Sequence, residues 1–134
     1  MTPTETVHAF FDAYSKADLD ASFALFHPEV HHTADSYNTV SRFCGTWDGL
    51  DALRSRVHDI IEHWSFETFA PVKVVAQGDD VAVKVHAVGV ERHTGQRIEM
   101  NTALFFTVQD GRIVAVDEIF DSALIERAME HPAA

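Results

Sequence analysis

Hydrophobic residues in the first half of the chain follow helical spacing. The opening Thr2-Pro3-Thr4-Glu5 has the form of a capping box with proline at the first helical position. The apolar face of the helix that it predicts consists of Val7, Phe10, Phe11, Tyr14 and Ala17. A second short helix is predicted to start at Asp18 and to end at Pro28; its buried residues would be Leu19, Phe23 and Phe26.

A third helix is predicted after a loop. Residues 29–35 read as a short strand, and residues 36–49 read mostly as loop. Asp48 is the predicted N-cap of the helix that follows. The buried side of this helix would consist of Leu50, Leu53, Val57, Ile60, Ile61 and Trp64.

The second half of the chain changes to a strand pattern. Four β-rich segments cover 66–77, 81–92, 97–109 and 112–120. Turn residues separate them, and short turns between consecutive strands require antiparallel hairpins. Pro71, inside the first of these segments, indicates an edge strand or a bulge. After the last strand, the segment SALIERAME (122–130) predicts a terminal helical turn.

Helices followed by a meander predict an α+β fold with one domain over residues 1–134. We expect three N-terminal helices to pack on one face of a strongly curved, cone-shaped antiparallel sheet. A twisted sheet that curls around helices encloses a pocket between them.

The last predicted strand carries a carboxylate on its apolar side. Because successive side chains alternate, Glu118 shares a face with Val114, Val116 and Phe120. The opposite face would carry Ile113, Ala115, Asp117, Ile119 and Asp121. A carboxyl group among apolar neighbours should have a raised pKa, which suits a general acid or base. The alternative is a shifted register that leaves Glu118 in solvent, with Asp117 and Asp121 turned inward or capping.

The composition and net charge of the chain argue against some classes of binding partner. Apolar residues make up 46% and charged residues 23% of the chain, as in an ordinary globular protein. A net charge of −11 should repel phosphate backbones and anionic lipids, so we expect neither nucleic acid nor membrane as a partner. The N-terminus has no signal-peptide pattern, and the single cysteine, Cys44, fits a reducing compartment, so a cytoplasmic location is expected.

The histidines do not predict a metal site. His58 and His63 lie on different sides of a helix, and no pair of histidines with a carboxylate stands at ligand spacing. The adjacent His31 and His32 would point to opposite faces of a strand, so only one of them should face the pocket and transfer protons there. Cys44 is read as a small buried residue and not as a nucleophile.

Three stretches carry a resemblance to a known family. They are FFDAYSKADLDASFALFHPEV (10–30), FCGTWDGLDAL (43–53) and FFTVQDGRIVAVDEIFD (105–121). Together with the hairpin strands they resemble the nuclear transport factor 2-like superfamily, which includes ketosteroid isomerase, limonene-epoxide hydrolase and the SnoaL-like polyketide cyclases. The resemblance specifies the fold better than the reaction, since one fold carries many chemistries.

The resemblance implies roles for two residues, but two of the family's catalytic sets have no match in this chain. It places Glu118 in the pocket as the acid of the last strand, and Tyr14 as the pocket-lining hydrogen-bond donor. The isomerase's general base aligns with Thr33, with Asp35 two residues later, so that mechanism does not transfer intact. The hydrolase's acid–Arg–acid set has no counterpart in VKVHAVGVER (83–92), and His31 and Thr33 replace its Tyr and Asn.

Further pocket residues follow from strand parity and loop position. Trp47 and Tyr37 are candidates for the rim, or else simply pack the long loop. His86 is a candidate ligand contact whose face is alternatively the outer, dimer-forming one. Asn101 and Thr102 straddle two faces, so one of them should reach the pocket.

The predicted function is that of a small-molecule pocket protein that forms a homodimer through the open face of its sheet. If it is an enzyme, we expect cofactor-free acid–base chemistry on an apolar carbonyl-bearing ligand: isomerisation, cyclisation or dehydration. The candidate catalytic residues are Glu118, Tyr14, His31 and His32; candidate ligand contacts are Thr33, Asp35, Tyr37, Trp47, His86, Asn101 and Phe120. The alternatives are a non-catalytic ligand binder and a dimeric interaction module.

Overall fold

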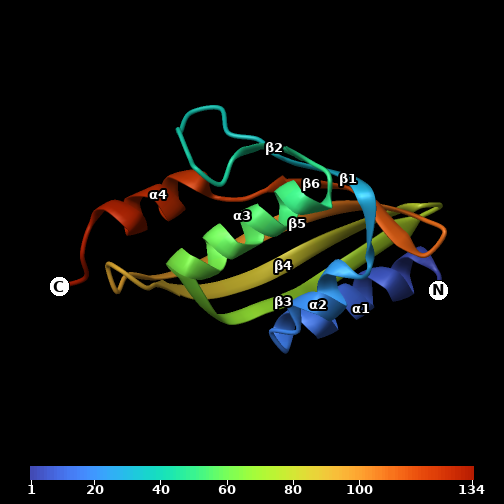
Figure 1. Ribbon diagram of the computed structural model, residues 1–134. Coiled ribbons are helices and arrows are strands. Elements are labelled where there is room, and N and C mark those ends of the chain that lie inside the picture. The colour runs from blue at the N-terminus through green and yellow to red at the C-terminus, as the bar shows by residue number, and fades with distance from the viewer.

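The computed structural model describes residues 1–134 as four helices and one six-stranded sheet. The helices are α1 (Pro3–Ser15), α2 (Leu19–Phe23), α3 (Leu50–His63) and α4 (Ser122–Glu130). The strands are β1 (Phe26–Ala34), β2 (Gly45–Asp48), β3 (Trp64–Gln77), β4 (Asp80–Glu91), β5 (Arg97–Gln109) and β6 (Arg112–Ile119). Helices α1, α2 and α3 lie against one side of the curled sheet (Figure 1). The predicted α+β architecture is confirmed.

The starts of the first two helices are those that the sequence predicts. Thr2 Oγ1 accepts the Glu5 backbone N–H at 3.1 Å, and Glu5 Oε1 accepts the Thr2 backbone N–H at 2.8 Å, which completes the capping box. Asp18 Oδ1 accepts the Ala21 backbone N–H at 3.1 Å and so caps α2. Local capping chemistry therefore fixes this part of the fold.

Two predicted helix boundaries are wrong. Helix α2 ends at Phe23 because β1 already begins at Phe26, and Pro28 lies in this strand, where its pairing with β6 is irregular. Asp48 does not cap α3, because it ends β2 and its carboxylate pairs with His31. The N-cap is Gly49, which has φ +88° and no capping side chain.

The sheet has the order β2-β1-β6-β5-β4-β3 and is not closed. Strands β3 to β6 form the predicted antiparallel meander, whereas β1 joins β6 in parallel. Pro71 lies on the edge strand β3, beside a shift in register. The two predicted alternatives, an edge strand and a bulge, therefore occur together. Strand β2, which was predicted as loop, pairs with β1 and extends the sheet beside the pocket.

Two groups of buried residues form the core. The larger joins α1 and α3 to the sheet through residues such as Val7, Phe11, Leu53, Val85 and Phe106. The smaller lies under α4 and contains Phe43, Trp64, Ile98, Ile125 and Ala128. The tail that was predicted as one helical turn is thus a 9-residue helix, because its apolar face covers this second group.

No helix combines the length and the apolar character that crossing a membrane requires.

Candidate functional site

A cavity of about 100 Å³ lies between the helices and the concave face of the sheet. Of its 23 lining residues 18 are hydrophobic, so its wall is mostly apolar. The polar lining residues are Ser22, His32, Arg56, Thr102 and Glu118. The pocket that the sequence predicts is therefore present, and three of its polar residues form one cluster.

Glu118 faces this cavity, as the alternation predicts. It lies opposite Leu104 of β5, while Val116 lies opposite Phe106, and the Glu118 side chain is only 15% exposed. The prediction is wrong for Ile113, which is fully buried, and for Val114, which has no partner on β5. Val114 is the extra residue of a β-bulge, so the side-chain parity changes at this point.

His32 and Arg56 contact the Glu118 carboxylate from two other elements. His32 Nε2 on β1 lies 3.1 Å from Glu118 Oε1, and Arg56 Nη1 on α3 lies 3.2 Å from the same oxygen. The His32 and Arg56 side chains are 8% and 5% exposed. Because β1 runs parallel to β6 and pairs His32 with Val116, Glu118 is the next residue along β6 on the same face.

The charge state of Glu118 differs from the expectation. Burial alone would raise the pKa of Glu118, but the positive charge of Arg56 and the hydrogen bond from His32 outweigh it and lower this pKa. The sequence-based expectation of a raised pKa is thus wrong, because it did not include Arg56. Glu118 is ionised near neutral pH.

The ionised carboxylate also orients the His32 ring. Since Glu118 Oε1 can only accept, His32 Nε2 must carry the proton and donate it. The 3.4 Å approach of Arg56 Nη1 to the same nitrogen is then a contact and not a second hydrogen bond. No protein atom bonds to His32 Nδ1 or Arg56 Nε, although both atoms are buried. Nδ1 is therefore the ring nitrogen without a hydrogen-bond partner in the protein.

Arg56 is a residue of this candidate site that the sequence analysis missed. Its guanidinium donates to the Phe43 carbonyl at 2.9 Å and stacks on the Trp47 ring at 4.5 Å. Trp47 in turn meets the His32 ring edge-on at 6.0 Å. The signal was its spacing: position 56 lies three residues after Leu53 and four before Ile60, on the buried face of α3.

Tyr14 lines the cavity from α1, as predicted. Its ring packs against Phe10 at 5.6 Å and against Phe69 at 5.4 Å. Burial and the negative charge of Glu118 raise the pKa of Tyr14 to about 12, although Arg56 acts in the opposite direction. Its hydroxyl therefore stays protonated and can donate a hydrogen bond to a ligand.

Three other candidates point away from the cavity, because they have the opposite strand parity. His31 pairs with Asp48, Thr33 donates to Asp117 at 3.0 Å, and His86 approaches Glu99 at 2.8 Å.

Of the remaining candidates in loops and strands, some are exposed and others line the cavity. Asp35, Tyr37 and Asn101 are exposed, whereas Thr102 turns inward. Phe120 lines the cavity, and Trp47 lies behind its polar cluster without lining it. Partly exposed Cys44 has its pKa raised by burial, which agrees with its assignment as a non-nucleophile.

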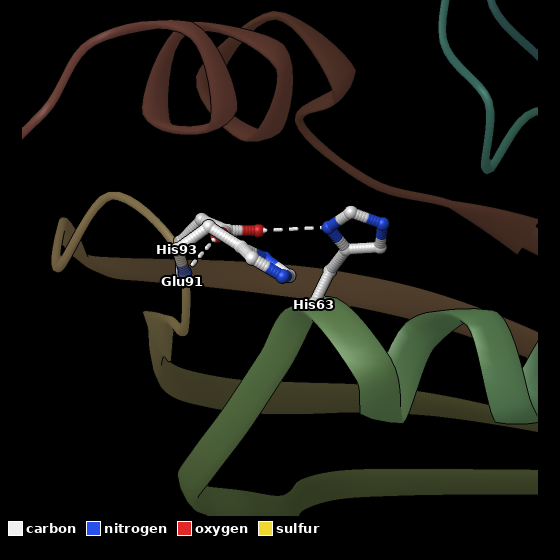
Figure 2. Close-up of side chains that lie close together, drawn as sticks. All are labelled: His63, Glu91 and His93. Atoms are coloured by element: carbon white, nitrogen blue, oxygen red, sulfur yellow. Dashed lines mark hydrogen bonds and ion pairs between the residues drawn. The ribbon is translucent and has the colours of Figure 1, made fainter.

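A second histidine–carboxylate cluster lies outside the cavity and contains His63, Glu91 and His93 (Figure 2). One possible ligand atom from each residue lies within 4.8 Å of the others. The sequence analysis missed this set because His63 ends α3, whereas Glu91 and His93 lie 28 and 30 residues later, at the end of β4 and in the turn after it.

The chain belongs to the SnoaL-like domain family, whose model matches residues 7–116. None of the curated proteins compared with it matches.

Solved structures share its fold. A nuclear transport factor 2-like protein from Burkholderia thailandensis is 26% identical, with a TM-score of 0.85 over 96% of this chain and 98% of that one. TerC, co-crystallised with polyporic acid, is 19% identical, with a TM-score of 0.84 over 96% and 98% of the two chains. A proposed polyketide cyclase from Xanthomonas campestris is 23% identical, with a TM-score of 0.74 over 95% and 94%.

Proposed function

We propose that the protein binds an apolar small molecule carrying a carbonyl oxygen and catalyses acid–base chemistry on it with its own side chains alone. The reaction class is isomerisation, cyclisation or dehydration. The observation that carries this proposal is the cluster of His32, Arg56 and Glu118 in the wall of an otherwise apolar cavity. Hereafter these three residues are called the inner cluster.

The chemistry of the lining defines the ligand. The predominance of hydrophobic residues favours an apolar body. Because the charge of Arg56 is balanced by that of Glu118, the cavity favours a ligand without net charge. The protonated Tyr14 hydroxyl supplies the donor for a carbonyl oxygen.

We assign proton transfer to His32, because it lines the cavity and its Nδ1 has no hydrogen-bond partner in the protein. Its Nδ1 takes a proton from a carbon beside the carbonyl, and the C–H electron pair moves into an enolate. Tyr14 donates a hydrogen bond to the enolate oxygen, and ionised Glu118 stabilises the imidazolium through Nε2. Return of the proton to another carbon gives isomerisation. Attack of the enolate carbon on a second carbonyl of the same molecule, whose oxygen takes the proton back from the imidazolium, gives cyclisation. Expulsion of a β-hydroxyl group, which leaves as water with that proton, gives dehydration.

Relatives of the same fold support the class of ligand. One is a proposed polyketide cyclase, and TerC was co-crystallised with polyporic acid. At these identities the likeness extends to the fold, so the assignment of roles rests on the inner cluster.

A thermal-shift screen with a library of small carbonyl compounds tests this proposal. Each hit is incubated with wild type, Glu118→Gln and Asp117→Asn, and turnover is followed by mass spectrometry or NMR. Asp117 is the matched control because it is the adjacent acid on β6 but is exposed. We expect Glu118→Gln to lose turnover and Asp117→Asn to keep it. Identical hits and identical turnover in all three proteins would remove Glu118 from the mechanism.

The second candidate is a non-catalytic ligand binder. It is favoured by the ion pair itself, since Arg56 holds Glu118 as a structural partner would. The same screen separates the two functions: a binder gives cavity hits with wild type but converts none of them.

We also propose that the protein is a homodimer formed through the outer face of the sheet. Phe105 and Ile119 are exposed there although both are large and apolar. Sedimentation of wild type and Phe105→Glu tests this: we expect a dimer for wild type and a monomer for the variant, whereas a monomeric wild type would contradict it.

A further inference from the structure

We propose that His63, Glu91 and His93 form a binding site for a single divalent transition-metal ion of the zinc class. These residues, hereafter the outer cluster, come from separate parts of the chain: His63 ends α3, Glu91 ends β4, and His93 lies in the turn after β4 (Figure 2). The proposed reaction does not use them. Two imidazoles and one carboxylate are a ligand set that binds Zn²⁺, Co²⁺, Ni²⁺ or Cu²⁺ and leaves positions for water.

Two of the separations are close to those of ligands around one ion. Glu91 Oε2 lies 3.2 Å from His63 Nδ1, and Glu91 Oε1 lies 3.2 Å from His93 Nδ1. Ligands at about 2.0–2.1 Å from zinc in a tetrahedron stand roughly 3.3 Å apart, which is close to these distances. These two contacts use different oxygens of Glu91, and one ligand atom from each of the three residues lies within 4.8 Å of the others, so the side chains must move closer together to hold one ion.

The carboxylate is held in place before any ion arrives. Glu91 is 1% exposed, and its Oε1 accepts the backbone N–H groups of His93 and Thr94. Oε2 is the oxygen outside these backbone bonds and faces His63. His93 is 61% exposed, so its ring can adjust and water can complete the coordination.

One neighbour of His63, Arg42, opposes metal binding, and another, Asp59, can favour it. Arg42 Nη1 donates to His63 Nε2 at 2.7 Å, which places the ring proton on Nδ1. An ion on Nδ1 requires this proton to leave and Nε2 to become protonated. Asp59 Oδ1 lies 3.8 Å from both His63 Nε2 and Arg42 Nη1, which is too long for a hydrogen bond. A small movement of Asp59 when an ion binds would let it accept from Nε2–H and pair with Arg42.

Titration with zinc tests the site. Wild type freed of metal by a chelator is titrated at pH 7 in competition with a chromophoric chelator, and cobalt is then substituted for its visible spectrum. We expect one ion per chain, and a loss of affinity of about 100-fold or more for His93→Gln and for His63→Gln. The matched control is His58→Gln, an exposed histidine on the same helix, which should bind as wild type does.

Two further variants distinguish a built site from adventitious binding by surface histidines. Asp59→Asn should weaken zinc binding about 10-fold, because it removes the acceptor for His63 Nε2–H. Arg42→Gln should strengthen it, because the competing donor and a nearby positive charge are removed. Failure of wild type to bind zinc more tightly than about 10 µM would overturn the proposal. Wild-type affinity in His93→Gln, or equal losses in His58→Gln, would also overturn it.

Discussion

The inner and outer clusters contain the same kinds of residue but differ in what surrounds them. In both, a carboxylate with a lowered pKa lies beside histidine, although burial alone would raise that pKa. At Glu118 the main opposing charge is the buried guanidinium of Arg56. At Glu91 the backbone N–H groups of His93 and Thr94 have that role, and no arginine touches the carboxylate.

This difference is the reason that we propose proton transfer for the inner cluster and a cation for the outer cluster. The inner cluster is neutral overall and opens on an apolar cavity, whereas the outer cluster retains an uncompensated carboxylate and an exposed imidazole. The residue types alone therefore do not determine the chemistry. The chemistry of each cluster depends on the nearest fixed charge and on the access of solvent.

A short loop segment connects the two clusters. Arg42 donates to His63, and the carbonyl of the next residue, Phe43, accepts from Arg56. The Phe43 ring also meets the His63 ring at 6.3 Å. Variants in one cluster should therefore be checked for effects on the other.

The largest expected effect on stability comes from removing the buried cation. Arg56→Met leaves the Glu118 carboxylate buried without its main counter-charge, so we expect a loss of about 3–5 kcal/mol in the free energy of unfolding, measured with urea. Replacing both partners, Arg56→Met with Glu118→Leu, should recover most of this loss. Arg54→Met, the exposed arginine on the same helix, is the control. Equal effects of Arg54→Met and Arg56→Met would show that the inner cluster holds no special pair.

The pH dependence of stability should identify Glu118. Its folded pKa is lowered below the unfolded value of about 4.3, so its contribution is complete above the unfolded pKa and is lost as pH falls through the folded pKa. The difference in unfolding free energy between wild type and Glu118→Gln should be largest from about pH 5 upward and should shrink below about pH 4. A difference that grows as the pH falls would contradict the lowered pKa.

The smallest expected effect concerns the outer cluster without metal. His93 is largely exposed, so His93→Gln should change the free energy of unfolding in metal-free buffer by only about 0.5 kcal/mol or less. Thermal melts with and without zinc measure this directly. A large loss in the free energy of unfolding without metal would mean that the outer cluster stabilises the fold and is not a binding site.

Much of the fold follows from local signals in the sequence. Thr2, Asp18 and the turns between the strands act within a few residues, so their effects can be read along the chain. The parallel pairing of β1 with β6 brings together strands about 80 residues apart, and no local pattern encodes it. Strand β2 was missed because its order comes from its partner β1.

The candidate site was predictable only in part, because some of its contacts join residues that are far apart in the sequence. Tyr14 and Glu118 stand on apolar faces whose period is visible, and both line the cavity. Which of His31 and His32 faces inward depended on the register with β6, which the sequence left open. Arg56 was not singled out, because a charged residue on a helix is usually exposed.

The most direct test of the central claim is deuterium exchange into a bound carbonyl compound. With a hit from the screen, NMR follows the exchange of hydrogen at the carbon beside the carbonyl for wild type and for His32→Gln. We predict that wild type accelerates this exchange and that His32→Gln is slower by about 10²–10⁴-fold. Equal exchange rates for the two proteins would contradict the assignment of proton transfer to His32.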